Sequence, residues 1–442
     1  MRSTVRAVFL GRSAPLTWPY PFVNLKEEAA KLQSQIESLV RKRELDIDLQ
    51  GWDIVTSDRD IVEMQDDIIR ADGLLVIYLS STVEDLFLRL VNFDVPIVLY
   101  AKPYAGHVWS LSGELKKRGK KVLVVATEDL SELVDRLKLL EVIGKLRKTR
   151  VLLFRDKYAG FYSWFSSPSY IRTLRDKYGL TVVWRSSKDI RDAYDSISDK
   201  EAGKLAKEVI DKAEGVKEPS MNDIVKACRL YLALKSLIEK ENVHAVTIDC
   251  FGMLADGTIP NVIPTTPCLA FSLLNDEGIP AACEADLDSL LTMLIFKYLC
   301  NKPSFISDPV IDTKRGVIAH AHCTAATRMA GYGARPEPFI LRSHSESKKY
   351  VSLQVRMSVG QVVTVAKLNV ALGKLYTSTG EIIGNPDIEW GCRTKFETKV
   401  ANAERFLEDF SGGLHRVVVY GDYSRELEWL SRLLGMEFAR EI

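Results

Sequence analysis

The sequence predicts an α/β protein with two doubly wound parallel α/β domains followed by a β-rich C-terminal domain of antiparallel, barrel-like strands. Residues 1–146 alternate between short apolar runs and amphipathic stretches, and a second alternation occupies residues 147–310. Such alternation is typical of parallel sheets covered by helices. From residue 311 to 442, β-like runs with frequent glycine follow one another, which indicates antiparallel strands. We therefore expect three domains, at residues 1–146, 147–310 and 311–442.

The first domain is predicted from five strand–helix alternations. Nothing resembling GxGxxG follows the first strand, which continues as FLGRSAPLTWP, so we expect no dinucleotide site. The aromatic loop Trp18, Pro19, Tyr20 and Pro21 is either packing, a lid or a sugar-stacking surface, and Trp18 is a candidate substrate residue. The predicted strands are 5–10, 53–56, 74–79, 96–100 and 121–126, and the predicted helices are 25–43, 58–70, 82–91, 109–118 and 129–143.

A basic cluster at residues 145–150 marks the start of the second domain, where a solvated linker is the expected role. The predicted strands of this domain are 151–154, 180–184 and 245–248, and its predicted helices are 170–178, 200–213, 221–241 and 264–274. In the third domain we expect strands at 338–341, 350–357, 361–368, 373–379, 381–383 and 417–420, with helices at 401–410 and 424–434.

The stretch 279–308 carries the first candidate site. A short apolar run ends on Glu284, an apolar segment of helical length spans 287–300, and a second short run, 304–307, ends on Asp308. This pattern predicts a strand, a crossover helix and a neighbouring parallel strand, so both acids would lie at one sheet edge, with Asp249 ending a third strand there. Two hard oxygen ligands suit Mg²⁺ or Mn²⁺. In the competing interpretation the acids have structural roles only. Asp286 would be the N-cap of the helix, Glu284 would interact with the helix N-terminus, and Asp308 would start a turn.

Histidines supply further candidates. His320 and His322 alternate next to Cys323, so both would face one side of a strand, and they are about equally well explained as ligands or as satisfied structural residues. His415 follows two glycines and precedes an apolar strand. The chain has no GxSxG motif and no P-loop, so a serine hydrolase or P-loop NTPase is not supported.

Composition narrows the class of protein. Lys plus Arg is 60 and Asp plus Glu is 59, which gives no electrostatic case for nucleic acid or membrane. The seven cysteines contain no CxxC pair, so neither a zinc ribbon nor a disulfide framework is expected. The N-terminus does not read as a signal peptide and no apolar run approaches bilayer length. We therefore expect a cytoplasmic globular protein.

Several motifs together resemble the L-fucose isomerase and L-arabinose isomerase family. They are CEADLDSLLTML, the acid ending FISDP, AHC at 321–323, CRT at 392–394 and GGLHRVVVYGD at 412–422. The resemblance is clearest from about residue 246 onward, and the order acid, acid, distant histidine after a glycine turn is its most specific part.

The resemblance implies a metal-dependent aldose–ketose isomerase, with Mn²⁺ (or Mg²⁺ or Co²⁺), that assembles as a trimer or hexamer. By motif position, Glu284, Asp308 and His415 would be the metal ligands, and the two acids would also be the catalytic pair of a cis-enediol mechanism. His322 matches a further histidine near the metal. A base on the proton and a Lewis acid on the adjacent oxygens are what moving a proton between C1 and C2 requires.

Departures from the family pattern leave the identity of the sugar substrate undetermined. Leu287 replaces a tryptophan and His415-Arg416 replaces a double histidine, while Arg393 and Arg416 could reach an anionic sugar substituent or form ordinary salt bridges. The leading prediction is an isomerase of the fucose or arabinose type. The alternatives are a non-catalytic sugar-binding or regulatory paralogue and a Rossmann-like binding protein whose acidic edge is structural.

Overall fold

The computed structural model describes residues 1–12, 17–18, 24–156 and 167–441. The chain forms two compact units, one made of Met1–Lys148 with Arg425–Phe438 (unit 1) and the other of Thr149–Ser424 with Ala439–Ile442 (unit 2). The finer division at residue 310 stays a prediction. The predicted fold class is confirmed, because two parallel α/β sheets are followed by an antiparallel barrel. Across the described ranges, no helix combines the length and the apolar character that a membrane crossing needs.

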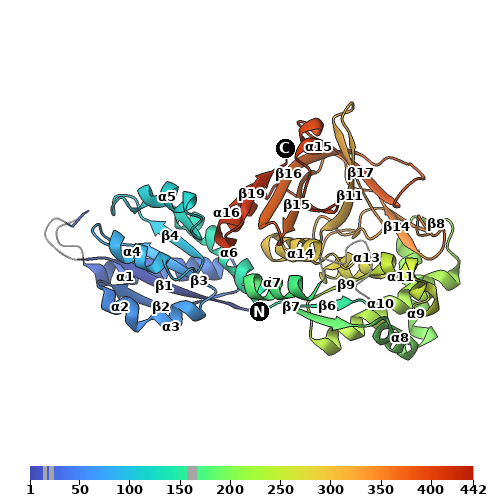
Figure 1. Cartoon of the computed structure of the whole chain (residues 1–442), viewed down its shortest axis with the longest axis horizontal. Helices are drawn as coiled ribbons and strands as arrows, with labels where there is room; N and C mark the ends of the chain where they lie inside the picture. Colours follow the sequence, from blue (N-terminus) through green and yellow to red (C-terminus); the bar gives the residue numbers. More distant parts are fainter. Residues whose placement is uncertain (13–16, 19–23, 157–166, 442) are drawn as a thin grey trace. The chain divides into compact units, whose positions relative to one another are not determined.

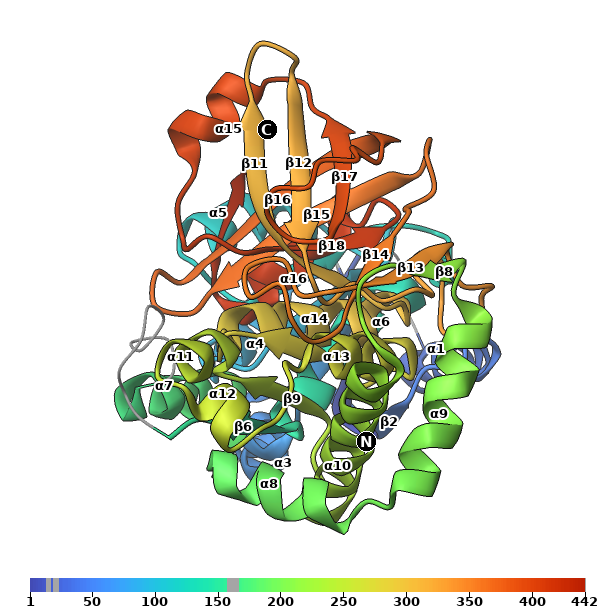
Figure 2. The ribbon, with the colours of Figure 1, turned by 90° about the vertical axis from the view of Figure 1, so that its right-hand side faces the viewer.

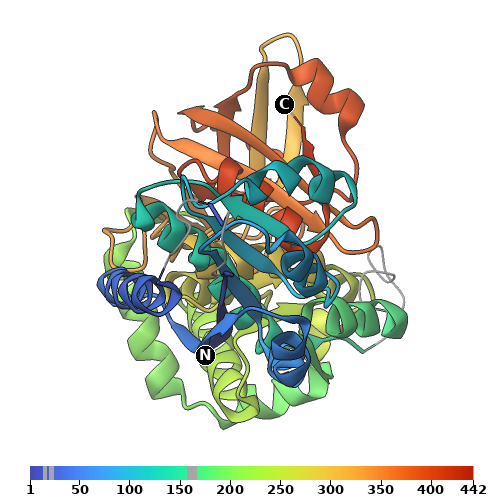
Figure 3. The ribbon, with the colours of Figure 1, turned by 90° about the vertical axis from the view of Figure 1, so that its left-hand side faces the viewer.

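Unit 1 is built on a five-stranded parallel sheet in the order β2-β1-β3-β4-β5. Leu74, Val76 and Tyr78 of β3 share a core with α2, α3 and α4, whereas α1 and α6 pack together against the sheet. Helices therefore cover both faces, as the doubly wound pattern predicts (Figure 3). The elements are β1 (Ser3–Leu10), α1 (Leu25–Lys42), β2 (Ile47–Val55), α2 (Asp58–Glu63), α3 (Gln65–Arg70), β3 (Gly73–Tyr78), α4 (Glu84–Val91), β4 (Ile97–Ala101), η1 (Val108–Leu111), α5 (Ser112–Lys117), β5 (Val122–Val125), α6 (Leu130–Arg147) and, near the end of the chain, α16 (Ser424–Leu434).

Unit 2 begins with a four-stranded parallel sheet in the order β10-β9-β6-β7. Helices α10 and α13 bury their apolar residues against it. The elements are β6 (Arg150–Phe154), α7 (Pro168–Tyr178), β7 (Thr181–Arg185), α8 (Ser187–Ser196), α9 (Asp199–Lys212), β8 (Gly215–Val216), α10 (Met221–Glu241), β9 (Ala245–Ile248), α11 (Cys250–Ala255), α12 (Thr258–Asn261), α13 (Cys268–Asp276), β10 (Ala281–Cys283) and α14 (Leu287–Cys300).

The rest of unit 2 contains the barrel, in which six strands follow the order β15-β18-β11-β12-β17-β16 and the pairing of β15 with β16 closes the ring. Figure 2 shows β11, β12 and β17 side by side in it. Closure removes the free edges of the sheet. The elements are β11 (Phe305–Asp312), β12 (Val317–His322), β13 (Phe339–Arg342), β14 (Ser352–Val355), β15 (Val362–Asn369), β16 (Lys374–Gly384), β17 (Thr394–Lys399), α15 (Ala403–Asp409), β18 (Arg416–Tyr420) and β19 (Glu437–Arg440). Strand β19 adds to β16, and β14-β13-β8 form a small separate sheet.

One predicted pairing is wrong. The run that ends at Asp308 is not a parallel neighbour of β10, because β11 continues to Asp312 and pairs antiparallel with β12 and β18 in the barrel. The predicted crossover therefore leads from the parallel sheet into a different sheet.

Helix α14 connects these two layers and contacts β9 and β10 on one side and β15, β18 and β11 on the other (Figure 1). Every residue from Leu287 to Phe296 is buried, including Asp288, Ser289 and Thr292. A helix that is apolar nearly all round belongs in the interior. It begins at the N-cap Asp286, whose Oδ1 accepts a hydrogen bond from the Ser289 backbone N–H at 2.9 Å, so the predicted cap and the predicted helix are confirmed.

Candidate functional site

Glu284 follows β10 in a strained backbone conformation. Its φ is +64° and that of the next residue, Ala285, is +56°. Left-handed conformations cost about 1–3 kcal/mol at non-glycine residues and persist where the surrounding structure enforces them. Here the two residues form the turn between β10 and the N-cap Asp286, and Glu284 lines a pocket. The strain is thus located at the residue that the sequence singled out.

The barrel supplies the other candidate ligands through the register of its strands. Ser307 of β11 is opposite Arg416 of β18, so Asp308 and His415 are the next pair along these antiparallel strands. Asp308 is also opposite Ala321 of β12, one residue before His322. Residues more than a hundred positions apart in the sequence are therefore adjacent in space.

These residues converge on one point. The Nε2 atom of His415 lies 3.3 Å from Oδ1 of Asp308 and 3.7 Å from Oε2 of Glu284. Donor atoms of Glu284, His322 and His415 all lie within 4.8 Å of one another. The structure thus places His415 near both predicted acidic ligands and groups it with Glu284 and His322, whereas Asp308 contacts His415 but is outside that group of three. Of the predicted parallel sheet edge, only the ends of β9 and β10 are present, because Asp308 belongs to the barrel.

A buried chain of polar groups orients His415. Its Nδ1 lies 2.9 Å from Oδ2 of Asp286, which also accepts a hydrogen bond from the Lys367 ammonium at 2.6 Å. Lys367 donates in addition to Ser289 Oγ at 2.8 Å. Because Nδ1 is engaged with Asp286, Nε2 is directed toward Glu284 and Asp308. Such second partners fix the ring orientation of ligating histidines.

Sequence reasoning missed Lys367, because nothing local distinguishes it from a solvent-facing lysine of a β-strand. The structure places it in β15 opposite the N-terminus of α14, with 1% of its side chain exposed. A further buried acid, Asp288, accepts a hydrogen bond from the Tyr170 hydroxyl. Burial, opposed by the charge of Lys367 and reinforced by that of Asp286, raises the pKa of Asp288 to about 7.

Glu284, His322 and His415 have perturbed pKa values. Burial raises the pKa of Glu284 to about 7; the nearby His415 opposes the shift and Asp308 reinforces it. Burial lowers the pKa of His322 to about 4, so this imidazole is neutral at pH 7. For His415, burial alone would lower the pKa, but the hydrogen bond with Asp286 and the charges of Glu284, Asp286 and Asp308 raise it. A carboxyl group with a pKa near neutrality is suited to proton transfer.

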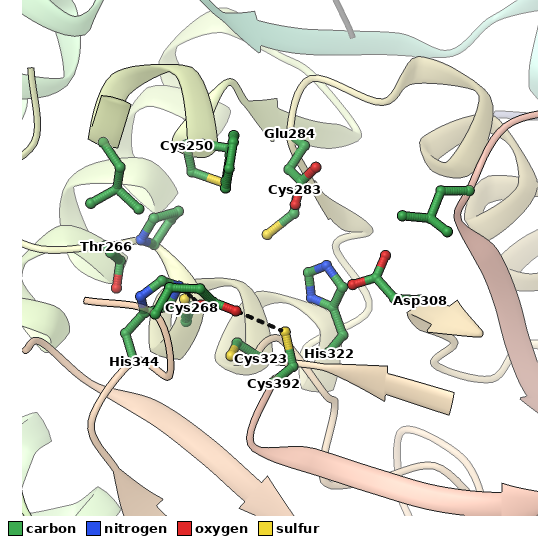
Figure 4. Close-up of a pocket in the computed structure, with 15 residues that line it drawn as sticks. Cys250, Thr266, Cys268, Cys283, Glu284, Asp308, His322, Cys323, His344 and Cys392 are labelled. Carbon is green, nitrogen blue, oxygen red and sulfur yellow. Dashed lines mark hydrogen bonds and ion pairs between the residues drawn. The ribbon is translucent and has the colours of Figure 1, made fainter. Parts of the chain in front are cut away.

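The cluster opens into a cavity of about 270 Å³ (Figure 4). Glu284, Asp308 and His322 lie along one side of it, and Cys323, Cys392 and His344 line its lower part in this view. Its other lining residues are Cys250, Phe251, Leu254, Thr266, Pro267, Cys268, Cys283, Glu346 and Leu414. None of the lining residues in the described part of the chain is a lysine or an arginine.

Cysteines are unexpectedly frequent in this cavity, since five of the seven line it. The sequence suggested buried small hydrophobes, and Cys250, Cys268 and Cys283 fit that expectation because all three are buried. For Cys323, a hydrogen bond from Cys392 is the chief cause that lowers the thiol pKa to about 6. The proximity of these two residues has no signal in the sequence, because they lie in separate loops.

The remaining candidate residues have other partners. Asp249 caps α11 by accepting a hydrogen bond from the Gly252 N–H at 3.2 Å, and its carboxylate lies 2.9 Å from Arg155 Nε. It ends β9 beside β10, as expected, but is not among the described residues of the cavity wall.

The two candidate arginines form hydrogen bonds with other residues of the protein. Arg393 donates to the Ser343 carbonyl at 2.8 Å and to Glu389 at 2.9 Å. Arg416 is fully buried and donates to Glu441 at 3.0 Å. Trp18 belongs to unit 1 and is 45% exposed, whereas residues 19–21 of the same loop lie outside the described residues. Its role in binding substrate stays a prediction.

Two relatives with the name of a sugar isomerase are similar to this chain. The chain is 24% identical over 268 residues to the sulfoquinovose isomerase of Clostridium sp. (strain MSTE9), covering 59% of this chain and 58% of that protein. It is 21% identical over 307 residues to the sulfoquinovose isomerase of Alkalicoccus urumqiensis, covering 68% of this chain and 66% of that protein. The chain is therefore similar to sugar isomerases over somewhat less than two thirds of their length. No family model matches it.

Comparison with solved structures gives only distant likeness. A sugar-binding protein of a sugar ABC transporter from Bacillus halodurans is 10% identical, with 71% of this chain and 91% of that chain covered and a TM-score of 0.17. A periplasmic solute-binding protein of an ABC transporter from Actinobacillus succinogenes, with bound D-allose, is 10% identical, with 67% and 92% covered and a TM-score of 0.18. Scores this low carry no conclusion about the whole chain.

Proposed function

We propose that this protein is a metal-dependent aldose–ketose isomerase whose site is formed by Glu284, Asp308 and His415, with His322 beside them. The observation that carries the proposal is the position of His415 Nε2, which lies 3.3 Å from Asp308 and 3.7 Å from Glu284, two acids that line a cavity of about 270 Å³. The similarity to sulfoquinovose isomerases and the resemblance to the fucose and arabinose isomerase family support the same reaction class.

The donor set fits a divalent cation. Two carboxylates and one or two imidazoles are ligands that Mn²⁺ accepts, and Mg²⁺ or Co²⁺ would also be compatible. Asp308 Oδ1 is buried and has no hydrogen-bond partner among the described residues. The clustering of acids also opposes ionisation of Glu284, which a cation would relieve. We therefore propose Glu284, Asp308 and His415 as the ligands, with Mn²⁺ as the preferred ion.

The reaction needs a proton to move between C1 and C2 of an open-chain sugar. The chemistry that a bound divalent cation supplies is Lewis-acid polarisation of the sugar oxygens. Glu284 lines the cavity, and in this proposal it takes the C2 proton and returns it to C1 through a cis-enediol. Asp308 is the second acid–base group for the hydroxyl protons. The chain Lys367–Asp286–His415 keeps the imidazole fixed during these steps.

The wall of the cavity favours an uncharged aldose. The relatives are named for sulfoquinovose, a sulfonated sugar, which would call for a cationic partner in the site. None of the described lining residues is a lysine or arginine, and the candidates Arg393 and Arg416 are engaged elsewhere. Phe251, Leu254 and Leu414 instead give the cavity an apolar side. We therefore propose a neutral sugar of the fucose or arabinose type.

The decisive experiment is ketose formation from a panel of aldoses, including L-fucose, L-arabinose and sulfoquinovose, with Mn²⁺ and with chelator. We expect turnover of a neutral aldose that chelator abolishes. Glu284→Gln at saturating Mn²⁺ should lower the rate by at least about 100-fold, the lower range for loss of a general acid–base group. Glu277→Gln is the control, because Glu277 pairs with Lys235 and Tyr231 and lies outside the cavity wall.

Other outcomes decide against parts of this proposal. Unchanged ketose formation in Glu284→Gln would remove Glu284 from the proton transfer. Binding of metal and sugar without turnover of any aldose would favour the non-catalytic paralogue. Assembly as a homo-oligomer, a trimer or hexamer, belongs to the same proposal and rests on the family resemblance. A cytoplasmic location is proposed with it and is supported by the seven cysteines without a CxxC pair.

A further inference from the structure

A second group of potential metal ligands lines the same cavity. Cys323 follows β12, Glu346 lies in the connection between β13 and β14, and Cys392 lies just before β17. The two sulfur atoms and a carboxylate oxygen of Glu346 all lie within 4.8 Å of one another. The Cys392 sulfur is 3.8 Å from Glu346 Oε1, and both cysteines are free thiols.

These separations are close to those of a tetrahedral zinc site. Zn–S distances of about 2.3 Å and Zn–O distances of about 2.0–2.2 Å place two sulfurs about 3.8 Å apart and a sulfur and an oxygen about 3.5 Å apart. The 3.8 Å between Cys392 Sγ and Glu346 Oε1 is already near the second value, and the two sulfurs, which lie within 4.8 Å, would reach the first by approaching at most about 1 Å. Glu346 is the ligand with the freedom to move, because its side chain is 51% exposed, whereas Cys323 is 2% exposed and fixes the position of the site.

An outer partner for the carboxylate is already present. His344 Nε2 lies 3.0 Å from Glu346 Oε2, and His344 Nδ1 lies 3.1 Å from Ser347 Oγ. Ligating carboxylates are commonly held by such partners. The arrangement leaves Oε1 of Glu346 on the side of Cys392.

We propose that Cys323, Glu346 and Cys392 form a second metal site that binds Zn²⁺. Two thiolates select a soft or borderline ion, whereas the carboxylate and imidazole set around Glu284 suits a harder one. The two sites would therefore share the cavity and differ in the metal they select. Three protein ligands leave a fourth position toward the cavity, as in zinc sites that bind water or a ligand.

Cobalt is the probe that separates the two sites, because only thiolate ligation gives sulfur-to-cobalt charge-transfer absorption. The full-length protein, stripped of metal under reducing conditions, is titrated with Co²⁺, and Zn²⁺ is then used to displace it. We expect thiolate charge-transfer bands that reach a plateau within two equivalents of Co²⁺, because the site around Glu284 also accepts this ion, and that disappear as Zn²⁺ displaces the thiolate-bound Co²⁺. His415→Ala should keep these bands, because it alters only the site around Glu284.

Two variants and one control test the assignment. Cys392→Ser removes one of the two thiolates, so it should lower the intensity of the bands by at least about half and weaken Zn²⁺ binding by more than about 100-fold, because loss of an outer partner alone costs about 10- to 100-fold. His344→Gln should keep the bands and weaken binding within that smaller range. Cys300→Ser is the matched control, since Cys300 is also a half-buried free thiol but lies outside the cavity wall.

Three results would overturn the proposal. They are Co²⁺ binding without thiolate bands, bands of undiminished intensity in Cys392→Ser, and a Cys323–Cys392 disulfide in the protein purified under reducing conditions. The wild-type spectrum decides the matter even if a variant fails to fold. Because the readout is spectroscopic, a protein without isomerase activity would leave this test intact.

Discussion

Replacing Lys367 with methionine tests the buried chain that orients His415. The ammonium lies 2.6 Å from Asp286 Oδ2, and the two side chains are 1% and 2% exposed. Methionine fills a similar volume but leaves Asp286 as a buried carboxylate without its cation. Breaking a buried ion pair in this way costs about 3–5 kcal/mol of unfolding free energy.

The stability difference between wild type and Lys367→Met should depend on pH in a definite direction. Burial by itself raises the pKa of Asp286, but the charge of Lys367 and the hydrogen bond with His415 lower it well below its ordinary value. A group with a lowered pKa in the folded state contributes stability that is present above its unfolded pKa and is lost as the pH falls. The difference between wild type and Lys367→Met should therefore be full at pH 7 and shrink as the pH falls below about 4.

Denaturant unfolding measures the loss of stability in unit 2, and calorimetric titration with Mn²⁺ measures the change in metal affinity. Besides the stability loss, we expect Mn²⁺ affinity to fall by about 10- to 100-fold, because His415 loses its fixed orientation. Lys302→Met is the control. The Lys302 ammonium donates to the Tyr420 carbonyl at 3.0 Å, and losing one such hydrogen bond should cost only about 1 kcal/mol.

The double variant Lys367→Met/Asp286→Asn distinguishes an electrostatic effect from a packing effect. Removing both charges should recover part of the loss, so that the two substitutions are coupled by about 2 kcal/mol. A loss below about 1 kcal/mol in Lys367→Met, or additive effects in the double variant, would refute the account of Asp286 as a carboxylate held by Lys367.

Three further predictions concern neighbouring parts of unit 2. Burial lowers the pKa of His320 to about 3, so the folded protein should lose about 2 kcal/mol between pH 6.5 and pH 5 as the unfolded chain takes up the proton. His320→Gln should lose less, and equal pH slopes in urea unfolding would contradict this. Asp308→Asn should weaken Mn²⁺ binding at least about tenfold by calorimetry, and unchanged affinity would remove Asp308 from the ligand set. Leu291→Ala, in the buried segment 287–296 of α14, should cost about 2–5 kcal/mol in urea unfolding, and a cost below about 1 kcal/mol would contradict its interior position.

The elements that the sequence predicted well are those with local signals. The alternation of short apolar runs and amphipathic stretches led to both parallel sheets, and α10 and α14 were predicted with the observed bounds. Asp286 was recognisable as an N-cap because it precedes an apolar helical segment and its side chain can reach the third residue. The fold class was therefore accessible from the residues alone.

The strand partners of β11 could not be predicted from local sequence signals. A four-residue apolar run ending in Asp308-Pro309 reads as a strand that stops, whereas the strand continues to Asp312 because antiparallel partners on both sides support it. Such pairing is non-local, and nothing within the run shows which sheet it joins. The predicted ligands met nevertheless, since the family resemblance identified their positions independently of the strand pairing.

The missed residues share one physical reason. Lys367, Cys392 and Glu346 acquire their roles from contacts between segments that are distant in the sequence. A lysine in a strand and a cysteine in a loop look ordinary until the facing element is known. The same holds for His320, which packs on Phe396 and bonds to Ser307 and Thr398, whereas His322, two residues later, faces the cavity.

The proposed ligands are divided between two layers of unit 2. Glu284 comes from the parallel sheet, whereas Asp308, His322 and His415 come from the barrel. An ion bound by ligands from both layers would link the parallel sheet to the barrel. At a free ion concentration one hundred times the dissociation constant, binding would add about 2.7 kcal/mol to the unfolding free energy of unit 2. If that ion is Mn²⁺, a cell with little manganese would contain a less stable form of the protein, which proteases degrade faster. The manganese concentration would then determine the abundance of the protein as well as its activity.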